Sequence, residues 1–201
     1  MERQPTYRGS LCKGVLETIR KESAVAAKVL DRAPGYAIEA IDECHGLSWV
    51  RAEFLDTLNS AYIDVVGHKA FVAFWRRYPA TAVGVPLLGP LFRGALRIFA
   101  TEPSGLFTWV GRAWHVTTRD YGFFECERSP NAAVLTMREL PTSCPLDQVC
   151  SATQGSLLGL LDLAGCDGDV EVNDSRLQRH GVVMFRATWR AAAAEANSST
   201  G

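Results

Sequence analysis

The sequence lacks the short motifs that mark serine hydrolases and phosphate-binding loops. Ser156, within the glycine-bearing segment 155–159, stands one position early for a nucleophile elbow and inside an expected helix. The segments GDVEVND and GVPLLGPLFRG have neither the glycine spacing nor the lysine of a phosphate-binding loop. We therefore expect Gly155 and Gly159 to allow close packing against a neighbouring element, because glycine permits another backbone to approach.

Histidine is scarce, with four residues in the whole chain, and their spacing matches no metal-binding pattern. Cys44 and His45 are adjacent, but a thiol nucleophile needs a base that faces it from another segment. A haem would need an axial histidine beside an apolar cavity. His68 and His115 flank the aromatic helices, so haem is left open but is not predicted as a cofactor.

The sequence also lacks targeting and membrane-spanning signals. Its polar start, MERQPTYRGS, has no apolar signal-peptide core. The longest apolar run, residues 83–100, is interrupted by prolines, glycines and arginines, which a span of about 20 apolar residues would not tolerate. We therefore expect a cytoplasmic protein whose six cysteines are free thiols, most of them serving as small hydrophobic side chains.

What the 201 residues do contain is an ordinary globular composition, 47% hydrophobic and 21% charged. We expect one globular domain over residues 1–189 and a disordered tail over residues 190–201, where the apolar periodicity ends. The charge is uneven: residues 67–119 carry a net +6 and the other residues a net −7. Nucleic-acid binding is not expected, because the sequence pI of about 6.4 is acidic and no recognised binding motif is present.

Helical periodicity dominates the first 117 residues. We expect a helix around residues 11–19 that restarts after Ser23, a loop or single helical turn over residues 36–43, and a helix beginning at Trp49 after Ser48 as N-cap. Three further helices are expected: one that Pro79 ends, one around residues 90–99 and one that Pro103 opens.

The periodicity then shortens to two, which indicates strands. Residues 121–137 read as one β-hairpin and residues 170–189 as a second, with a helix over residues 146–164 between them. Because strands and helices do not alternate throughout, this order predicts an α+β fold. Its N-terminal helical block packs on a four-stranded antiparallel sheet made of the two hairpins.

The segment 150–189 resembles the C-terminal part of the vinyl-reductase-type small-molecule-binding domain. The residues in matching places are Cys150, Gly155, Gly159, Asp174, Gly181 and Phe185. Leu177 and Met184 stand where that family has two further cysteines, so a zinc site like that family's would lack two thiolate ligands. We therefore expect no metal.

Over residues 8–189 the chain is more similar to a myxobacterial family of paralogues of unassigned function (domain of unknown function 2378). The similarity rests on YRGSLCKGVLETI, LSWVRAEFLDTLNSAYIDVVG, YGFFECE and the closing GDVEV to VVMFRATW hairpin. It implies the layout shared by haem-nitric-oxide-binding domains and the vesicle-tethering subunits of Golgi transport. Members of that broad group sense small ligands or dimerise and bind partners.

The function expected first is non-enzymatic: a regulatory or small-molecule-sensing domain with an apolar pocket between helices and sheet. Its ligand would be an apolar small molecule or lipid. The candidate lining residues are Phe71, Phe74, Trp75, Phe92, Phe107 and Trp114. The alternative is that these aromatic side chains simply fill the core.

The second expected function is a protein-interaction or scaffolding module that uses a basic face of the helical block to bind a protein partner or a second copy of the chain, as a homodimer. The candidate patch consists of Arg76, Arg77, Arg93 and Arg97, and it would suit an acidic protein, an anionic lipid or a nucleotide. Alternatively, carboxylates from other segments neutralise this face. An enzyme is disfavoured, because no acid, base and nucleophile stand at a defensible spacing, although sequence reasoning does not detect sites assembled from distant segments.

Overall fold

The computed structural model describes residues 4–82, 94, 103–173 and 182–190. The helix expected around residues 90–99 and the tail expected over residues 190–201 lie outside these ranges, apart from Gly94 and Arg190. Among the described helices, none is long and apolar enough to cross a bilayer.

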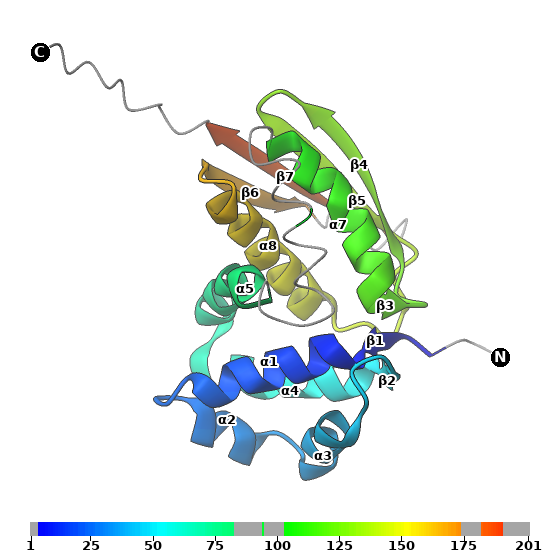
Figure 1. Ribbon diagram of the computed structural model, residues 1–201, viewed down its shortest axis with the longest axis vertical. Helices are drawn as coiled ribbons and strands as arrows, with labels where there is room; N and C mark the ends of the chain where they lie inside the picture. The colour runs from blue at the N-terminus through cyan, green and yellow to red at the C-terminus, as the bar shows by residue number, and fades with distance from the viewer. Residues whose placement is uncertain (1–3, 83–93, 95–102, 174–181, 191–201) are drawn as a thin grey trace, which may run out of the picture.

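Residues 6–66 form the N-terminal lobe, at the bottom of Figure 1. Its elements are β1 (Thr6–Arg8), α1 (Gly9–Lys21), α2 (Ala26–Arg32), α3 (Gly35–Glu43), β2 (Trp49–Arg51) and α4 (Ala52–Val66). Strand β1 pairs with β2 on one side and with β3 (Thr118–Arg119) on the other, both antiparallel. This small sheet, which the sequence did not reveal, ties the N-terminal lobe to the rest of the chain.

Three local predictions for the N-terminal lobe were wrong. Residues 36–43 are helical, because Pro34 fits the extended position before α3 and the helix buries Ala37 and Ile41. The helix expected from Trp49 starts at Ala52, since residues 49–51 pair with β1 instead. Neither expected serine caps its helix: α2 follows Val25, and the hydroxyl of Ser48 donates to the carbonyl of His45.

Residues 68–190 contain the remaining described elements. They are α5 (His68–Ala82), α7 (Pro103–Thr117), β3, β4 (Phe123–Ser129), β5 (Ala132–Arg138), α8 (Leu146–Leu163), β6 (Asp167–Asn173) and β7 (Val183–Arg190). The strand order β4-β5-β7-β6 has only antiparallel neighbours. The predicted α+β fold, with two hairpins separated by a helix, is confirmed.

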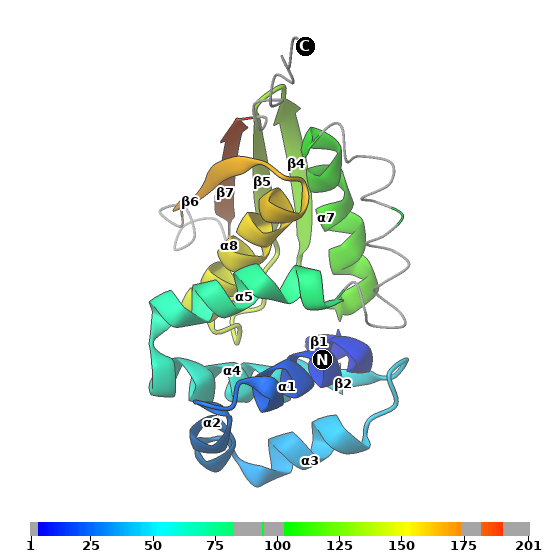
Figure 2. The same ribbon diagram turned by 60° about the vertical axis from the view of Figure 1, so that its left-hand side comes forward.

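One face of the four-stranded sheet carries the helices. Along β5, Ala133, Leu135 and Met137 are buried while the residues between them are half-exposed, and β7 alternates in the same way from Val183 to Trp189. Figure 1 shows α7 and α8 in front of this sheet, and Figure 2 shows α7 at its β4 edge. The core therefore lies between the sheet and these two helices, and continues below into the N-terminal lobe.

Helix α5 crosses α8 at very short range. A Cβ atom on Gly155 would approach the carbonyl oxygen of Val72 to less than 3.0 Å, and one on Gly159 would do the same at Arg76. The expectation that these glycines serve close packing is confirmed. Pro79 does not end α5, which continues to Ala82; its ring packs against the position that Gly159 leaves free.

Candidate functional site

A cavity of about 180 Å³ lies where the N-terminal lobe meets α5, α7 and α8. A water molecule needs roughly 10–15 Å³ by the same measure, so the space equals on the order of ten water molecules. The wall is almost entirely carbon. Its lining residues among those that the structure describes are Tyr7, Leu11, Leu55, Asp56, Asn59, Trp75, Tyr78, Pro79, Leu106, Trp109, Val110, Ala113, Trp114, Thr117, Phe124, Gln148, Val149, Ala152, Thr153, Ser156, Leu157 and Leu160.

The cavity exists because α8 has two different neighbours. Towards α5 its glycines allow backbone contact, whereas small side chains such as Ala152 and Ser156 border the open space. Across that space, Leu106, Val110 and Ala113 of α7 form the facing wall. The indole nitrogen of Trp114 donates to the carbonyls of Tyr121 and Gly122, 3.2 Å away in each case, which fixes the ring at the edge of the cavity.

The structure divides the six candidate pocket residues into three groups. Trp75 and Trp114 line the cavity. Phe71, Phe74 and Phe107 are fully buried and do not line it; Phe107 stacks on Trp189 with ring centroids 5.1 Å apart. Phe92 lies outside the described residues.

Sequence reasoning missed the polar residues of the wall. Asp56, Asn59 and Gln148 all line the cavity, yet the apolar periodicity of α4 and α8 drew attention only to their hydrophobic neighbours. Asn59 is only 4% exposed. A usable signal was present in the sequence, since Asn59 lies four positions after Leu55 and three before Tyr62, the spacing of one helix face.

Asp56 is the carboxylic acid among the described residues of this wall. It accepts hydrogen bonds from the hydroxyls of Tyr7 (3.3 Å) and Tyr121 (3.4 Å), whose rings pack 4.9 Å apart. Burial raises the pKa of the Asp56 carboxyl to about 7, although the two tyrosine hydrogen bonds favour its ionised form. The Sγ atom of Cys144 in turn contacts the Tyr121 hydroxyl at 3.3 Å, so Cys144 reaches this carboxyl only through Tyr121.

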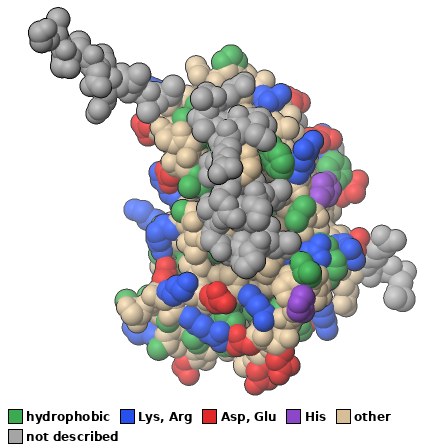
Figure 3. All heavy atoms as spheres, viewed as in Figure 1, with side chains coloured by type: hydrophobic (Ala, Val, Ile, Leu, Met, Phe, Trp, Pro, Cys, Tyr) green, Lys and Arg blue, Asp and Glu red, His purple; other side chains and the backbone are tan. Residues whose placement is uncertain are grey.

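The described part of the candidate basic patch is neutralised. Arg76 forms two hydrogen bonds of 2.7 Å with Asp162, and Arg77 pairs with Glu22 at 2.5 Å. Arg93 and Arg97 lie outside the described residues. Figure 3 shows basic and acidic side chains intermixed over the N-terminal lobe on this face, in agreement with the alternative in which other segments supply carboxylates.

Cys44 and His45 do not form a catalytic pair. The Cys44 thiol donates to the carbonyl of Ile41, and burial raises its pKa, which disfavours the reactive thiolate. His45 accepts from the backbone N–H of Leu47 through Nδ1. Within the described ranges, no three His, Cys, Asp or Glu side chains are grouped as metal ligands.

The residues behind the vinyl-reductase resemblance are only partly described. Cys150 and Phe185 lie on α8 and β7, the first half-buried and the second in the core, with Met184 beside it in the strand. Asp174, Leu177 and Gly181 lie outside the described ranges.

No family model matches the chain, and no curated protein does. Solved structures do match: an unliganded Fe(II) H-NOX protein from K. algicida (TM-score 0.65, 10% identity) covers 92% of this chain and 98% of its own. An oxygen-binding H-NOX domain related to soluble guanylate cyclases matches with a TM-score of 0.58 at 9% identity, over 91% of this chain and 95% of that one. The H-NOX from Shewanella woodyi matches at 0.52 and 16%, over 96% and 98%. The chain therefore has an H-NOX-like fold.

The described wall of the cavity does not fit haem, the group that another matching H-NOX structure names for that family. Proteins hold haem iron with His, Cys, Met or Tyr side chains. Among the described lining residues there is no His, Cys or Met, and no Lys or Arg to neutralise haem propionates. The two tyrosines are engaged, Tyr7 with Asp56 and Tyr78 with the carbonyl of Leu11, and burial raises the pKa of both phenols.

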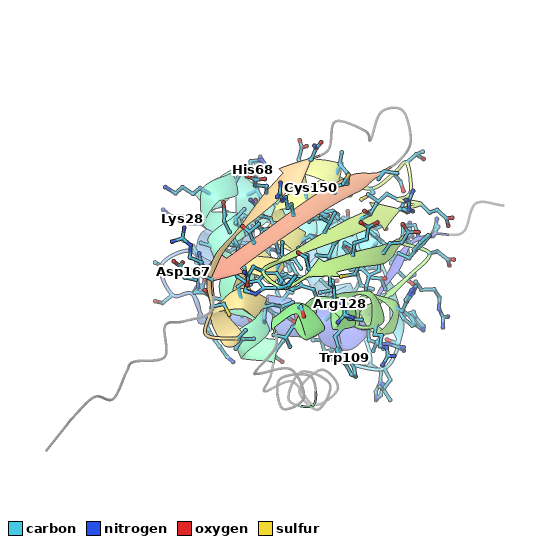
Figure 4. The ribbon with its side chains drawn as sticks, turned by 90° about the horizontal axis from the view of Figure 1, so that it is seen from above. Lys28, His68, Trp109, Arg128, Cys150 and Asp167 are labelled. Carbon is cyan, nitrogen blue, oxygen red and sulfur yellow. The ribbon has the colours of Figure 1, made fainter. Side chains whose placement is uncertain are left out.

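The described histidines lie elsewhere. His68 begins α5 and His115 lies in the last turn of α7, and neither lines the cavity. Figure 4 shows His68 and the cavity residue Trp109 at opposite edges of the molecule. Iron binding as named for the matching structures therefore has no donor set in the part of this cavity that the structure describes.

Proposed function

We propose that this protein is a non-enzymatic, small-molecule-sensing domain that binds an apolar ligand directly in the cavity between its lobes, without haem. The observation that carries the proposal is the cavity itself, about 180 Å³ of carbon-walled space in an H-NOX-like fold. Well-packed cores contain few voids larger than a water molecule, so a carbon-walled space of this size supports the assignment of a binding site.

The position of the cavity supports a regulatory role. Leu11 and Leu55 come from the N-terminal lobe, whereas Leu106 and Leu157 come from helices that pack on the sheet. In this proposal, residues 1–189 form one domain whose two lobes are bridged by the ligand. A ligand that contacts both lobes favours the arrangement in which all its contacts form, and so shifts the conformational population.

The same wall argues against catalysis. Its described polar groups include Asp56, which already accepts from two tyrosines, and Ser156, which has no histidine or lysine beside it among the described lining residues. Activation of a serine requires an adjacent base. The interaction-module alternative receives less support, because Arg76 and Arg77 are paired within the chain.

A thermal-shift screen of purified protein tests the proposal, with apolar aromatic compounds, aromatic acids, lipids and haem as probes. We expect an apolar compound to raise the unfolding temperature, since a ligand at 100 times its Kd stabilises a protein by about 2.7 kcal/mol. Haem should give no stoichiometric Soret band. A stoichiometric haem complex, or the absence of any stabilising apolar compound, would contradict the proposal.

A cavity-filling variant tests where the ligand binds. Ala152→Leu adds carbon to the cavity wall, so we expect the free protein to keep or gain stability, by about 1 kcal/mol, while the ligand-induced shift disappears. Ala164→Leu is the matched control, because Ala164 follows α8 and does not line the cavity. An undiminished shift in Ala152→Leu would place binding elsewhere.

A further inference from the structure

The small sheet β2-β1-β3 has one face towards the cavity and one towards solvent. Tyr7, in the middle of β1, is buried and lines the cavity. Because consecutive strand residues point to opposite faces, Arg8 lies on the outer face, next to its cross-strand partner Trp49. Arg119 of β3 lies on this face too, since it pairs with Thr6. Figure 1 shows the three strands together where the N-terminal lobe meets the end of α7, so both parts of the molecule contribute to the outer face.

Two arginines of the outer face stack on one tryptophan. The guanidinium carbon of Arg8 lies 3.7 Å from the centre of the Trp49 ring, and that of Arg119 lies 4.3 Å from the same centre. Arg8 is held in place by its hydrogen bonds to the carbonyls of Leu47 (2.7 Å) and Val116 (3.3 Å). A guanidinium group is attracted to an indole ring, but two cations on one ring also repel each other. The stack therefore keeps two positive charges close together on the surface.

The described part of the chain does not neutralise these two charges. Neither Arg8 nor Arg119 forms an ion pair with another described residue, and this includes Asp120, the next residue in the chain. Arg76 and Arg77 differ, because each is paired with a carboxylate of another segment. Uncompensated positive charge is therefore found at the small sheet and not at the described part of the predicted patch on α5.

Exposed aliphatic side chains lie next to the two arginines. Among the described residues, three large hydrophobic side chains are exposed, and Leu47 (57%) and Val116 (37%) are two of them. The backbone carbonyls of both accept hydrogen bonds from Arg8, so both residues lie beside the stack. Arg112, exposed one turn before Val116 on α7, adds a further positive charge. Arginine and tryptophan are enriched at the centres of protein–protein interfaces, and exposed apolar side chains beside them mark such surfaces.

We propose that this outer face docks an acidic segment of a partner protein, one in which carboxylates stand next to aliphatic residues. Carboxylates form paired, charge-assisted hydrogen bonds with guanidinium groups and would also offset the repulsion between the two cations. The aliphatic residues of the segment would cover the exposed apolar side chains. The inference goes beyond the proposed function and does not depend on it. We call this surface the arginine–tryptophan face, and its residues are Arg8, Leu47, Trp49, Val116 and Arg119.

A protein segment fits the arginine–tryptophan face better than the other common anions do. An acidic protein repels nucleic acids at long range, and the sequence pI here is about 6.4. Binding to a membrane surface generally needs a broad apolar face. The exposed aliphatic residues of this face are Leu47 and Val116, which cover a small area beside the charges.

The arginine–tryptophan face is assembled from two parts of the fold. Leu47 and Trp49 belong to the N-terminal lobe, whereas Val116 and Arg119 belong to the end of α7 and to β3. A partner that contacts both parts favours the arrangement of the lobes in which the face is complete. The face is therefore suited to a partner that responds to the relative position of the lobes.

The test uses fluorescein-labelled peptides of equal length, titrated with the full chain at low salt and followed by fluorescence anisotropy. One peptide repeats Glu-Glu-Leu, a second repeats Gln-Gln-Leu and a third repeats Glu-Glu-Ser. Because a hydrogen bond to a charged group contributes roughly tenfold in affinity, we expect the Glu-Glu-Leu peptide to bind at least about tenfold tighter than the Gln-Gln-Leu peptide. The Glu-Glu-Ser peptide should bind with intermediate affinity, and added salt should weaken both acidic peptides.

Variants of exposed residues locate the binding. Arg119→Gln should weaken binding of the Glu-Glu-Leu peptide by about tenfold and leave the unfolding temperature nearly unchanged, because Arg119 is exposed. Arg128→Gln is the matched control. It removes the same charge from another exposed arginine, at the end of β4 that lies away from β3 (Figure 1), and should keep the affinity. Leu47→Ser should remove the preference for Glu-Glu-Leu over Glu-Glu-Ser while binding of Glu-Glu-Ser persists.

The outcomes decide between the possible occupants. Equal binding of the Glu-Glu-Leu and Gln-Gln-Leu peptides, no binding of either, or equal losses in Arg119→Gln and Arg128→Gln would overturn the inference. So would tighter binding to phosphatidylserine vesicles or to oligothymidylate than to the Glu-Glu-Leu peptide, because the face would then serve a membrane or a nucleic acid. Self-association that Arg119→Gln abolishes would identify the occupant as a second copy of the chain instead. None of these measurements involves the cavity, so the proposed function is tested separately.

Discussion

The contact between α5 and α8 differs sharply from the space that the same two helices border on their other side. At Gly155 and Gly159 the two backbones are so close that a Cβ atom has no room. On the cavity side, Ala152 and Ser156 of α8 and Trp75 of α5 face about 180 Å³ of open space. Helix α8 is thus tightly packed on one face and borders unfilled space on the other.

This difference indicates how the molecule combines stability with binding. A rigid backbone contact holds α5 and α8 in register, so the cavity beside them keeps its shape without side chains to fill it. The cavity can therefore stay unfilled because the α5–α8 contact next to it is tightly packed. Substitutions in the two regions should therefore act in opposite ways, with large losses of stability at the contact and small losses or gains at the cavity.

The largest effect is expected at the contact itself. Gly159→Ala would bring a Cβ within 3.0 Å of the carbonyl oxygen of Arg76, a backbone atom that does not move independently of α5. Overpacking of this kind typically lowers the free energy of unfolding by about 2–3 kcal/mol, measurable by urea denaturation. Gly35→Ala is the control, because no heavy atom lies within 4 Å of its Cβ position. Equal losses in both variants would show that the α5–α8 contact is not special.

A smaller, pH-dependent effect is expected at Asp56, in the cavity wall. The folded-state pKa of about 7 exceeds the ordinary value of 3.8, so folding favours the protonated carboxyl. The stabilising contribution is complete below pH 4, and it is lost as the pH rises towards 7 and then stays lost.

Asp56→Asn keeps an acceptor for the tyrosines and cannot ionise. It should raise the free energy of unfolding by roughly 1–2 kcal/mol at pH 8, less than the full shift implies because Asp56 borders the cavity, and should flatten the pH dependence between 4 and 7. The measurement is a series of denaturation curves from pH 4 to pH 8. An unchanged slope in Asp56→Asn would show that another group carries the pH dependence.

Of the two faces of α8, the sequence predicted the tightly packed one, and it predicted the face that borders the cavity only in part. Two glycines four residues apart in an apolar helix predicted the close contact, because glycine spacing is a local signal. The two-hairpin sheet followed in the same way from alternation in residues such as Val183 and Phe185. These features depend on neighbours within a few positions of one another.

The cavity depends on segments far apart in the chain, and the sequence revealed it only in part. Trp75 and Trp114 were identified because they are aromatic, but Phe71 and Phe74, equally aromatic, turn into the core. Periodicity shows which residues are buried, and it does not show which of them border empty space. The convergence of Tyr7 and Tyr121 on Asp56, across 49 and 65 positions, had no sequence signal at all.

The smallest effect is expected from the ion pair at the edge of the close contact. Arg76 and Asp162 join α5 to α8 through two hydrogen bonds of 2.7 Å, but their side chains are 47% and 46% exposed. Solvent and salt screen such a pair, so Asp162→Asn should lower the free energy of unfolding by only about 0.2–1 kcal/mol, and less at 1 M salt. Denaturation at low and high salt measures this loss. If Asp162→Asn proved as damaging as Gly159→Ala, the contact would depend on charge rather than on the approach of two backbones, and the rigid side of the comparison would need a different explanation.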